Sequence, residues 1–155
     1  MSNMEQTYKR VLVGIDGSNH AFEAFKKAVE VARRNEGEVI VAAIIEQQLP
    51  TIMGMYPVGE SFLEEESQRK NQLLDECLTY AQSVNFPSVK KVLTYGQPKN
   101  LLATELPRDY QIDLIMVGQS GLSQLEKMMI GSVASYVIRK APCDVLVVST
   151  PEENQ

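Results

Sequence analysis

The chain has 155 residues, of which 44% are apolar and 23% charged, so its composition is that of one ordinary globular domain, expected over residues 1–155 with an ordered core from about 8 to 150. Its formal net charge of -5 disfavours binding to a phosphodiester backbone and excludes nucleic acid as an expected partner. No signal peptide is recognisable and no apolar run approaches the roughly 20 residues that span a bilayer, so we expect a cytoplasmic protein with no membrane contact.

The first third of the chain predicts two strands around one helix. Residues 11–15 are an apolar run rich in β-branched side chains, typical of a buried strand, and turn residues follow. Apolar residues then recur at helical spacing from residue 20 to residue 32, where Ser18 or Asn19 can cap the helix and Gly37 lies just past its end. Residues 39–45 predict a second buried strand.

Further along the chain, residues 47–59 contain two prolines and two glycines and predict a long loop. Ser61 and Glu64 form a capping box that predicts the start of a long helix. The rest of the chain predicts, in order, a strand at 89–95, a short helix that begins near Pro98, a strand at 114–117, a loop at 118–131, a helix at 132–140 and a strand at 145–148.

Five apolar strands therefore alternate with four helices, which predicts an α/β three-layer sandwich around a Rossmann-like parallel sheet. The expected strand order is 3-2-1-4-5. Ligands of such sheets bind beyond the carboxyl ends of the strands, where the order reverses. That place lies between residues 15–17 and residues 117–118.

The loop after the fourth predicted strand has a spacing that suits a polyphosphate. It begins Gly118-Gln119-Ser120-Gly121 and ends, nine residues later, in Gly131-Ser132. Glycines let backbone amides approach an anion, and a helix N-terminus attracts phosphate. The alternative is that these glycines only mark turns. The chain has neither a G-x-x-x-x-G-K-[ST] loop nor a G-x-G-x-x-G motif after its first strand.

In this loop the sequence resembles the nucleotide-binding form of the universal stress protein family, whose motif is G-x2-G-x9-G-[S/T]. Residues 11–18 and 141–148 also look like the first and last strands of that family, so the resemblance covers about residues 8 to 150. It implies a flavodoxin-like sheet, bound ATP, AMP or ADP, and a homodimer that often forms through the last strand, here Val145–Val148. Gln119-Ser120 and Asp144 depart from the residues common in the family.

The resemblance also implies roles for single residues. Asp16 would lie near the adenosine and help to place Mg²⁺ or Mn²⁺, the backbone of Ile44 would pair with the adenine edge, and Val117 would line the ribose. The phosphate and ribose contacts would come from Gly118, Gly121, Gly131, Ser132 and Val133. The full expected nucleotide-binding set is Gly14, Ile15, Asp16, Gly17, Ser18, Ile44, Val117, Gly118, Gln119, Ser120, Gly121, Gly131, Ser132 and Val133.

Several residues leave alternatives open. Asp16 either contacts the ligand or caps the turn that follows it. Residues 128–130 are either an apolar lid over the nucleotide or core beneath the loop. His20 is expected to be a solvated neighbour of the helix start rather than a catalytic base, and Cys77 and Cys143 are expected to be packing thiols rather than a disulfide.

Three classes of function follow. The first is a dimeric, nucleotide-dependent regulator of a stress response, with no catalytic residue. The second is a slow ATPase or nucleotidyl-transfer enzyme that would use Asp16, Ser132 and a metal ion. The third is an interaction module that binds no nucleotide, which the intact glycine spacing disfavours.

Overall fold

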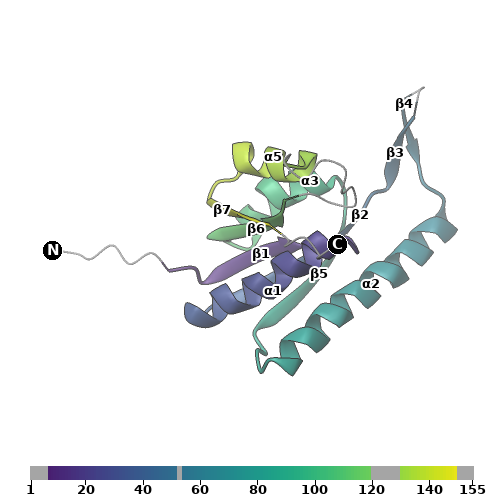
Figure 1. Ribbon diagram of the computed structural model, residues 1–155. Helices are drawn as coiled ribbons and strands as arrows, with labels where there is room; N and C mark the ends of the chain where they lie inside the picture. The colour runs from purple at the N-terminus through teal and green to yellow at the C-terminus, as the bar shows by residue number, and fades with distance from the viewer. Residues whose placement is uncertain (1–6, 52–53, 120–129, 150–155) are drawn as a thin grey trace, which may run out of the picture.

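The computed structural model describes residues 7–51, 54–119 and 130–149, and a parallel sheet lies at its centre (Figure 1). The five strands of this sheet are β1 (Arg10–Gly14), β2 (Glu38–Ile45), β5 (Val89–Tyr95), β6 (Leu114–Gly118) and β7 (Asp144–Val148). They are all parallel and lie in the order β5-β2-β1-β6-β7. Numbered along the chain, this is the predicted order 3-2-1-4-5, which is confirmed.

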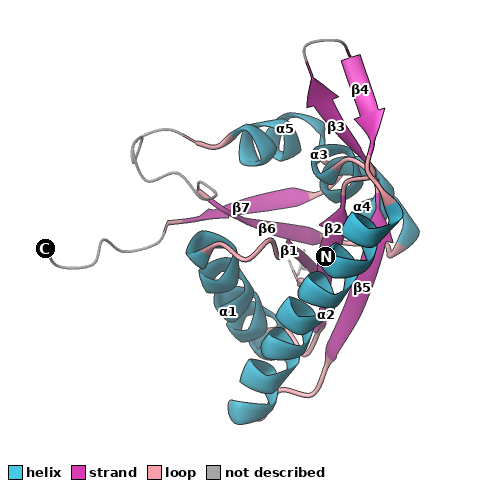
Figure 2. Cartoon of the chain, turned by 90° about the vertical axis from the view of Figure 1, so that its right-hand side faces the viewer, coloured by secondary structure: helices cyan, strands magenta, loops and turns pink. Residues whose placement is uncertain are grey.

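Helices cover both faces of the sheet (Figure 2). The helices on one face are α1 (Asn19–Arg34) and α2 (Glu60–Ser83). The helical segments on the other face are α3 (Pro98–Asn100), η1 (Leu101–Glu105), α4 (Leu106–Asp109) and α5 (Ser132–Lys140). The segments from α3 to α4 follow one another without a break and correspond to one predicted helix, so the expected three layers and four helices are confirmed.

The alternation of side chains along β1 builds both layers of the core. Val11 and Val13 belong to the apolar cluster beneath α1 and α2. Leu12 belongs to the opposite cluster, where it lies in register with Ile40 of β2 and Ile115 of β6. All of these side chains are fully buried. A strand that is apolar on both faces is stable only when both faces are covered, which is why the chain folds as a parallel sheet between helices.

Two predictions of helix ends meet different outcomes. Ser18 is the N-cap of α1, and its Oγ accepts a hydrogen bond of 3.1 Å from the amide of Ala21, as expected. The predicted capping box of Ser61 and Glu64 is wrong, because the N-cap of α2 lies two residues before Ser61 and the helix begins at Glu60. Gly59 occupies the N-cap there and has no side chain to cap the helix.

The predicted loop at 47–59 is also wrong. It contains β3 (Gln48–Thr51) and β4 (Gly54–Pro57), which pair antiparallel as a separate hairpin that projects from the body of the domain (Figure 1). Each strand of a two-stranded ribbon is an edge, so Pro50 and Pro57 can be accommodated without breaking an inner ladder of hydrogen bonds.

Within the described part of the chain, no helix combines the length and apolarity that crossing a bilayer requires.

Candidate functional site

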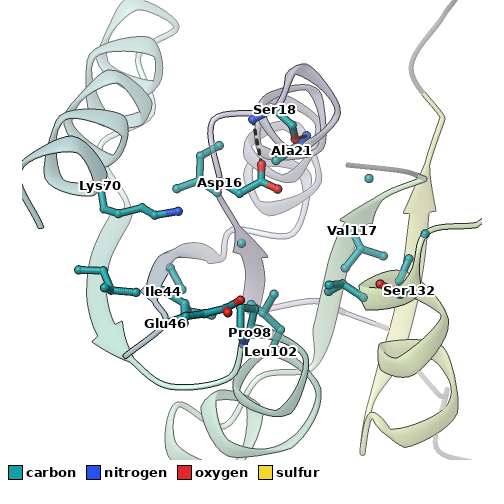
Figure 3. Close-up of a pocket in the computed structure, with 18 of the residues that line it drawn as sticks. Asp16, Ser18, Ala21, Ile44, Glu46, Lys70, Pro98, Leu102, Val117 and Ser132 are labelled. Carbon is teal, nitrogen blue, oxygen red and sulfur yellow. Dashed lines mark hydrogen bonds between the residues drawn. The ribbon is translucent and has the colours of Figure 1, made fainter. Parts of the chain in front are cut away.

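A cavity of about 540 Å³ opens at the carboxyl ends of β1, β2 and β6, where the strand order reverses. This is the position where open α/β sheets bind ligands. Its walls also include the first turns of α2 and α5 and one face of η1 (Figure 3). The lining residues are Gly14, Ile15, Asp16, Ser18, Ala21, Ala42, Ile44, Ile45, Glu46, Phe62, Glu66, Lys70, Pro98, Leu102, Met116, Val117, Gly118, Gly131, Ser132, Val133 and Ala134.

Most of the residues predicted from the sequence meet in this cavity. Those that line it are Gly14, Ile15, Asp16, Ser18, Ile44, Val117, Gly118, Gly131, Ser132 and Val133. Pro98, which follows the third strand of the sheet, also borders it. Ser120 and Gly121 lie outside the described residues.

Gly17 and Gln119 are near the cavity but do not line it. Gly17 has a φ of 93° and borders a smaller hollow of about 280 Å³ beside α1. Gln119 acts through its main chain: its amide donates to the carbonyl of Val148 at 3.0 Å, and its carbonyl accepts from the amide of Gly131 at 2.8 Å. Gln119 therefore joins the end of β6 to both β7 and the start of α5.

Asp16 and Ser18 organise the turn at the end of β1. Asp16 Oδ1 accepts a hydrogen bond of 2.9 Å from the amide of Ser18, and Ser18 in turn caps α1 (Figure 3). The turn-capping alternative for Asp16 is thus confirmed, while its carboxylate also lines the cavity. Among the residues the structure describes, no group of three or more His, Cys, Asp or Glu side chains is placed to hold a metal ion.

The N-terminus of α5 supplies the hydrogen-bond donors of the opposite wall. Gly131 is the N-cap and has no side chain to accept from the first turn. Within the described residues, no acceptor is found for the backbone amides of Ser132, Val133 and Ala134, which all line the cavity. Unpaired amides and the positive end of the helix dipole together favour an anion at this place.

Two of the cavity's glycines are closely packed, and at Gly118 the neighbouring atoms are backbone. A Cβ on Gly118 would lie 2.9 Å from the carbonyl carbon, the carbonyl oxygen and the Cβ of His20. A Cβ on Gly14 would lie 2.9 Å from the side chain of Leu102. Gly118 therefore lets α1 approach the end of β6, a physical reason for this glycine that does not depend on any ligand.

The α2 side of the cavity holds charged residues that the sequence analysis missed. Lys70 is only 8% exposed, although lysine is rarely buried, and Glu66 and Glu46 line the same cavity. Burial lowers the pKa of Lys70, as does neighbouring Arg69, while the carboxylates of Glu66, Asp16 and Glu46 act in the opposite direction. The signal in the sequence is the spacing 70, 74, 77 and 81, which places Lys70 on the apolar stripe of α2.

The remaining singled-out residues lie outside the cavity. His20 is not solvated at Nδ1, which is buried and has no hydrogen-bond partner within the described residues. Ile130 is 43% exposed, so it is not core beneath the loop, and Met128 and Met129 lie outside the described residues. The two cysteines are free thiols, and burial raises the pKa of Cys77 to about 12 and that of Cys143 to about 11.

The structure is thus a five-stranded parallel α/β domain with a cavity where the strand order reverses. Residues 7–149 match the model of the Universal stress protein family, and the chain belongs to that family. It is 37% identical over 146 residues to a putative universal stress protein of Staphylococcus haemolyticus, a match that covers 94% of this chain and 87% of that protein.

Solved structures of universal stress proteins have a similar fold. The universal stress protein UspA of Lactobacillus plantarum superposes with a TM-score of 0.70 at 24% identity, over 93% of this chain and 99% of that one, and supports the fold. A universal stress protein in complex with cAMP superposes with a TM-score of 0.65 at 26% identity, over 92% of this chain and 98% of that one.

Proposed function

We propose that this member of the universal stress protein family binds ATP, or AMP or ADP, in the 540 Å³ cavity and acts as a nucleotide-dependent regulator of a stress response. The observation that carries the proposal is that the amides of Ser132, Val133 and Ala134, on one wall of that cavity, have no acceptor among the residues that the structure describes. Such a helix N-terminus at a switch point is a ready-made phosphate site. The relative in complex with cAMP supports an adenine nucleotide as the ligand.

The lining of the cavity supports one orientation of the nucleotide. The phosphates would lie against residues 131–134, where none of the lining residues is acidic. The adenosine would lie toward Asp16 and Ile44, at the ends of β1 and β2. We propose that the backbone of Ile44 pairs with the adenine edge and that Val117 lines the ribose.

A divalent ion would be held mainly by the ligand. Asp16 has already committed Oδ1 to the amide of Ser18, and no three-residue metal cluster exists within the described part of the chain. Mg²⁺ accepts such a site, because it commonly binds one or two carboxylates together with phosphate oxygens and water. The residues therefore fit Mg²⁺ or Mn²⁺ only as a companion of the phosphates.

The composition of the cavity favours binding over turnover. The described residues that line it include no arginine and no histidine. Phosphoryl transfer gains most of its rate from cations on the transferring group and from a residue that positions the nucleophile. We therefore assign the site to a regulator, and sustained ADP release from a saturated complex would count against that assignment.

We also propose a homodimer that forms through β7, the edge strand of the sheet. Leu146 is 44% exposed on this strand, and Val145 and Val147 are only partly covered. Unpaired edges that carry apolar side chains are stabilised by pairing with another chain. Light scattering of the purified protein, compared with a Leu146→Lys variant, tests this part of the proposal: a wild type that is monomeric overturns it.

The nucleotide proposal is tested on the purified protein. Bound ligand is extracted and identified by mass spectrometry, and the affinities of ATP, ADP, AMP and adenosine are measured by calorimetry. We expect an adenine nucleotide in the extract and tighter binding of ATP than of adenosine, because adenosine has no phosphate to reach the α5 amides. An extract free of adenine nucleotides together with no measurable ATP affinity would overturn the proposal.

A further inference from the structure

Lys70 is a largely buried lysine that the proposed phosphate site does not use. It lies on α2, is more than nine-tenths buried, and lines the cavity opposite Ser132 (Figure 3). Within the described residues, its Nζ forms neither a hydrogen bond nor an ion pair. Because Nζ is not among the buried side-chain atoms that lack a partner in the described residues, it is reachable from the cavity, where a bound ligand can pair with it.

The surroundings of Lys70 are acidic. Asp16, Glu46 and Glu66 are the carboxylates that act on its charge, and Arg69 is the cation that opposes them. Glu66 and Arg69 form an ion pair with each other at 3.1 Å, and Asp16 accepts from Ser18, so both carboxylates already have partners. The ammonium is thus held near negative charge while its own three donors remain unused within the described structure.

The charges around Lys70 determine which part of the ligand can bind at the α2 side of the cavity. Three carboxylates repel phosphate, and residues 131–134 offer a better phosphate site on the other wall. A neutral group with hydrogen-bond acceptors suits Lys70, because an ammonium only donates. Among the parts of an adenine nucleotide, the ring nitrogens of the base are neutral acceptors.

Resting on the adenine nucleotide proposed above, we propose that Lys70 is a specificity-determining residue whose ammonium donates a hydrogen bond to a ring nitrogen of the bound base. The ligand then supplies an acceptor for the ammonium. In this arrangement α2, together with the ends of β1 and β2, contributes to recognition of the base. The lysine accordingly discriminates between bases by the acceptors that they present.

The test pairs one protein change with one ligand change. Lys70→Met keeps the length of the side chain and removes the charge, while Lys91→Met removes the same charge from an ion pair on β5 that lies outside the cavity. Calorimetry measures the Kd of ATP, adenosine and the 1-deaza, 3-deaza and 7-deaza analogues of ATP for the wild type and both variants. Circular dichroism confirms that each variant is folded.

Loss of a hydrogen bond from a charged donor corresponds to a Kd about 10 to 100 times larger. We expect that loss for Lys70→Met with both ATP and adenosine, and no loss for Lys91→Met. One deaza analogue should bind the wild type more weakly by a similar factor and bind Lys70→Met no more weakly than ATP does. Such coupling between one side chain and one ligand atom identifies a direct contact.

Three results would overturn the inference while leaving the nucleotide site in place. The first is a Kd that is unchanged in Lys70→Met, and the second is a weaker affinity of this variant for ATP but not for adenosine. The third is that each of the three deaza analogues loses the same affinity relative to ATP in the wild type as in Lys70→Met. The second result would assign Lys70 to the phosphates. A wild type that binds no adenine nucleotide would overturn the proposed function as well, so the two failures are told apart by the wild type.

Discussion

The two walls of the cavity are built from different materials. The wall formed by β6 and α5 is made of main chain: Gly118 admits the backbone of His20, and the α5 amides face the cavity. The wall formed by α2 contains charged side chains, since Lys70 and Glu66 of this helix line the cavity. The β6–α5 wall thus offers backbone amides, which almost every residue has. The α2 wall offers charged groups, which depend on the identity of single residues.

This difference has a thermodynamic consequence. Main-chain groups at a strand end and a helix start are held by the fold itself, so the β6–α5 wall needs only that nothing larger than glycine intrudes at Gly118. Partial loss of water around the Lys70 ammonium, which lowers its pKa, opposes folding when the cavity holds no ligand. Substitutions in the first wall should therefore lower stability, and removal of Lys70 in the second wall should raise it.

The largest effect is expected at Gly118. In Gly118→Ala the new Cβ would meet backbone atoms of His20 at 2.9 Å, and backbone cannot rotate out of the way as a side chain can. We expect the free energy of unfolding to fall by about 3 kcal/mol, the upper range for overpacking. Urea denaturation followed by circular dichroism measures it.

Gly59→Ala is the matched control for this substitution, because no atom lies within 4 Å of the Cβ that it would add. It replaces the N-cap of α2 and should cost under about 1 kcal/mol. Equal losses in the two variants would show that close packing at Gly118 is not what the β6–α5 wall depends on.

An effect of opposite sign is expected for Lys70→Met in the absence of nucleotide. Removing the buried charge should raise the free energy of unfolding by about 1 to 2 kcal/mol. Burial lowers the pKa of Lys70 below its ordinary value of 10.5, against the pull of Glu66, Asp16 and Glu46. The unfolded chain therefore binds more protons at alkaline pH, and this residue's contribution to stability rises as the pH rises toward 10.5.

The gain in stability from Lys70→Met should accordingly shrink as the pH rises through that window. Parallel denaturation of wild type and variant at several alkaline pH values isolates this contribution, because other titrating groups act on both proteins alike. A variant less stable than the wild type at neutral pH would contradict the contrast between the two walls.

The smallest effect is expected at Ser18, whose side chain lies between the walls. Ser18→Ala removes the acceptor for the amide of Ala21, and loss of an N-cap costs about 1 kcal/mol. Ser18→Asn keeps an acceptor there and should retain most of the stability. If both variants lose the same amount in thermal melts, the capping bond is not the cause.

Sequence patterns predicted the sheet because its strands are apolar on both faces. The run at 11–15 and the run at 39–45 identify buried parallel strands by composition, and covalent connectivity leaves few strand orders to choose from. The hairpin at 48–57 was missed for the same reason that the sheet was found: its prolines and glycines read as a loop, and pairing between two edge strands tolerates them.

The candidate site also has one part that the sequence predicted and one part that it did not. Glycine spacing and turn residues predicted the main-chain wall, since backbone requirements leave a mark on the sequence. Lys70 escaped prediction because it follows the charged residues Glu64, Glu65, Glu66 and Arg69, and a charge run usually indicates a solvated face. Only its helical phase with Leu74 and Cys77 separates it from that run, and phase does not reveal where a helix docks.

The peptide group of Gln119 connects the start of α5 to the end of β7. It accepts from the amide that begins α5 and donates to the carbonyl that ends β7. A displacement at the start of α5 can therefore be transmitted to the outermost strand through the main chain of one residue. Because the side chain takes no part in either bond, this linkage should survive substitution of Gln119 by most other residues.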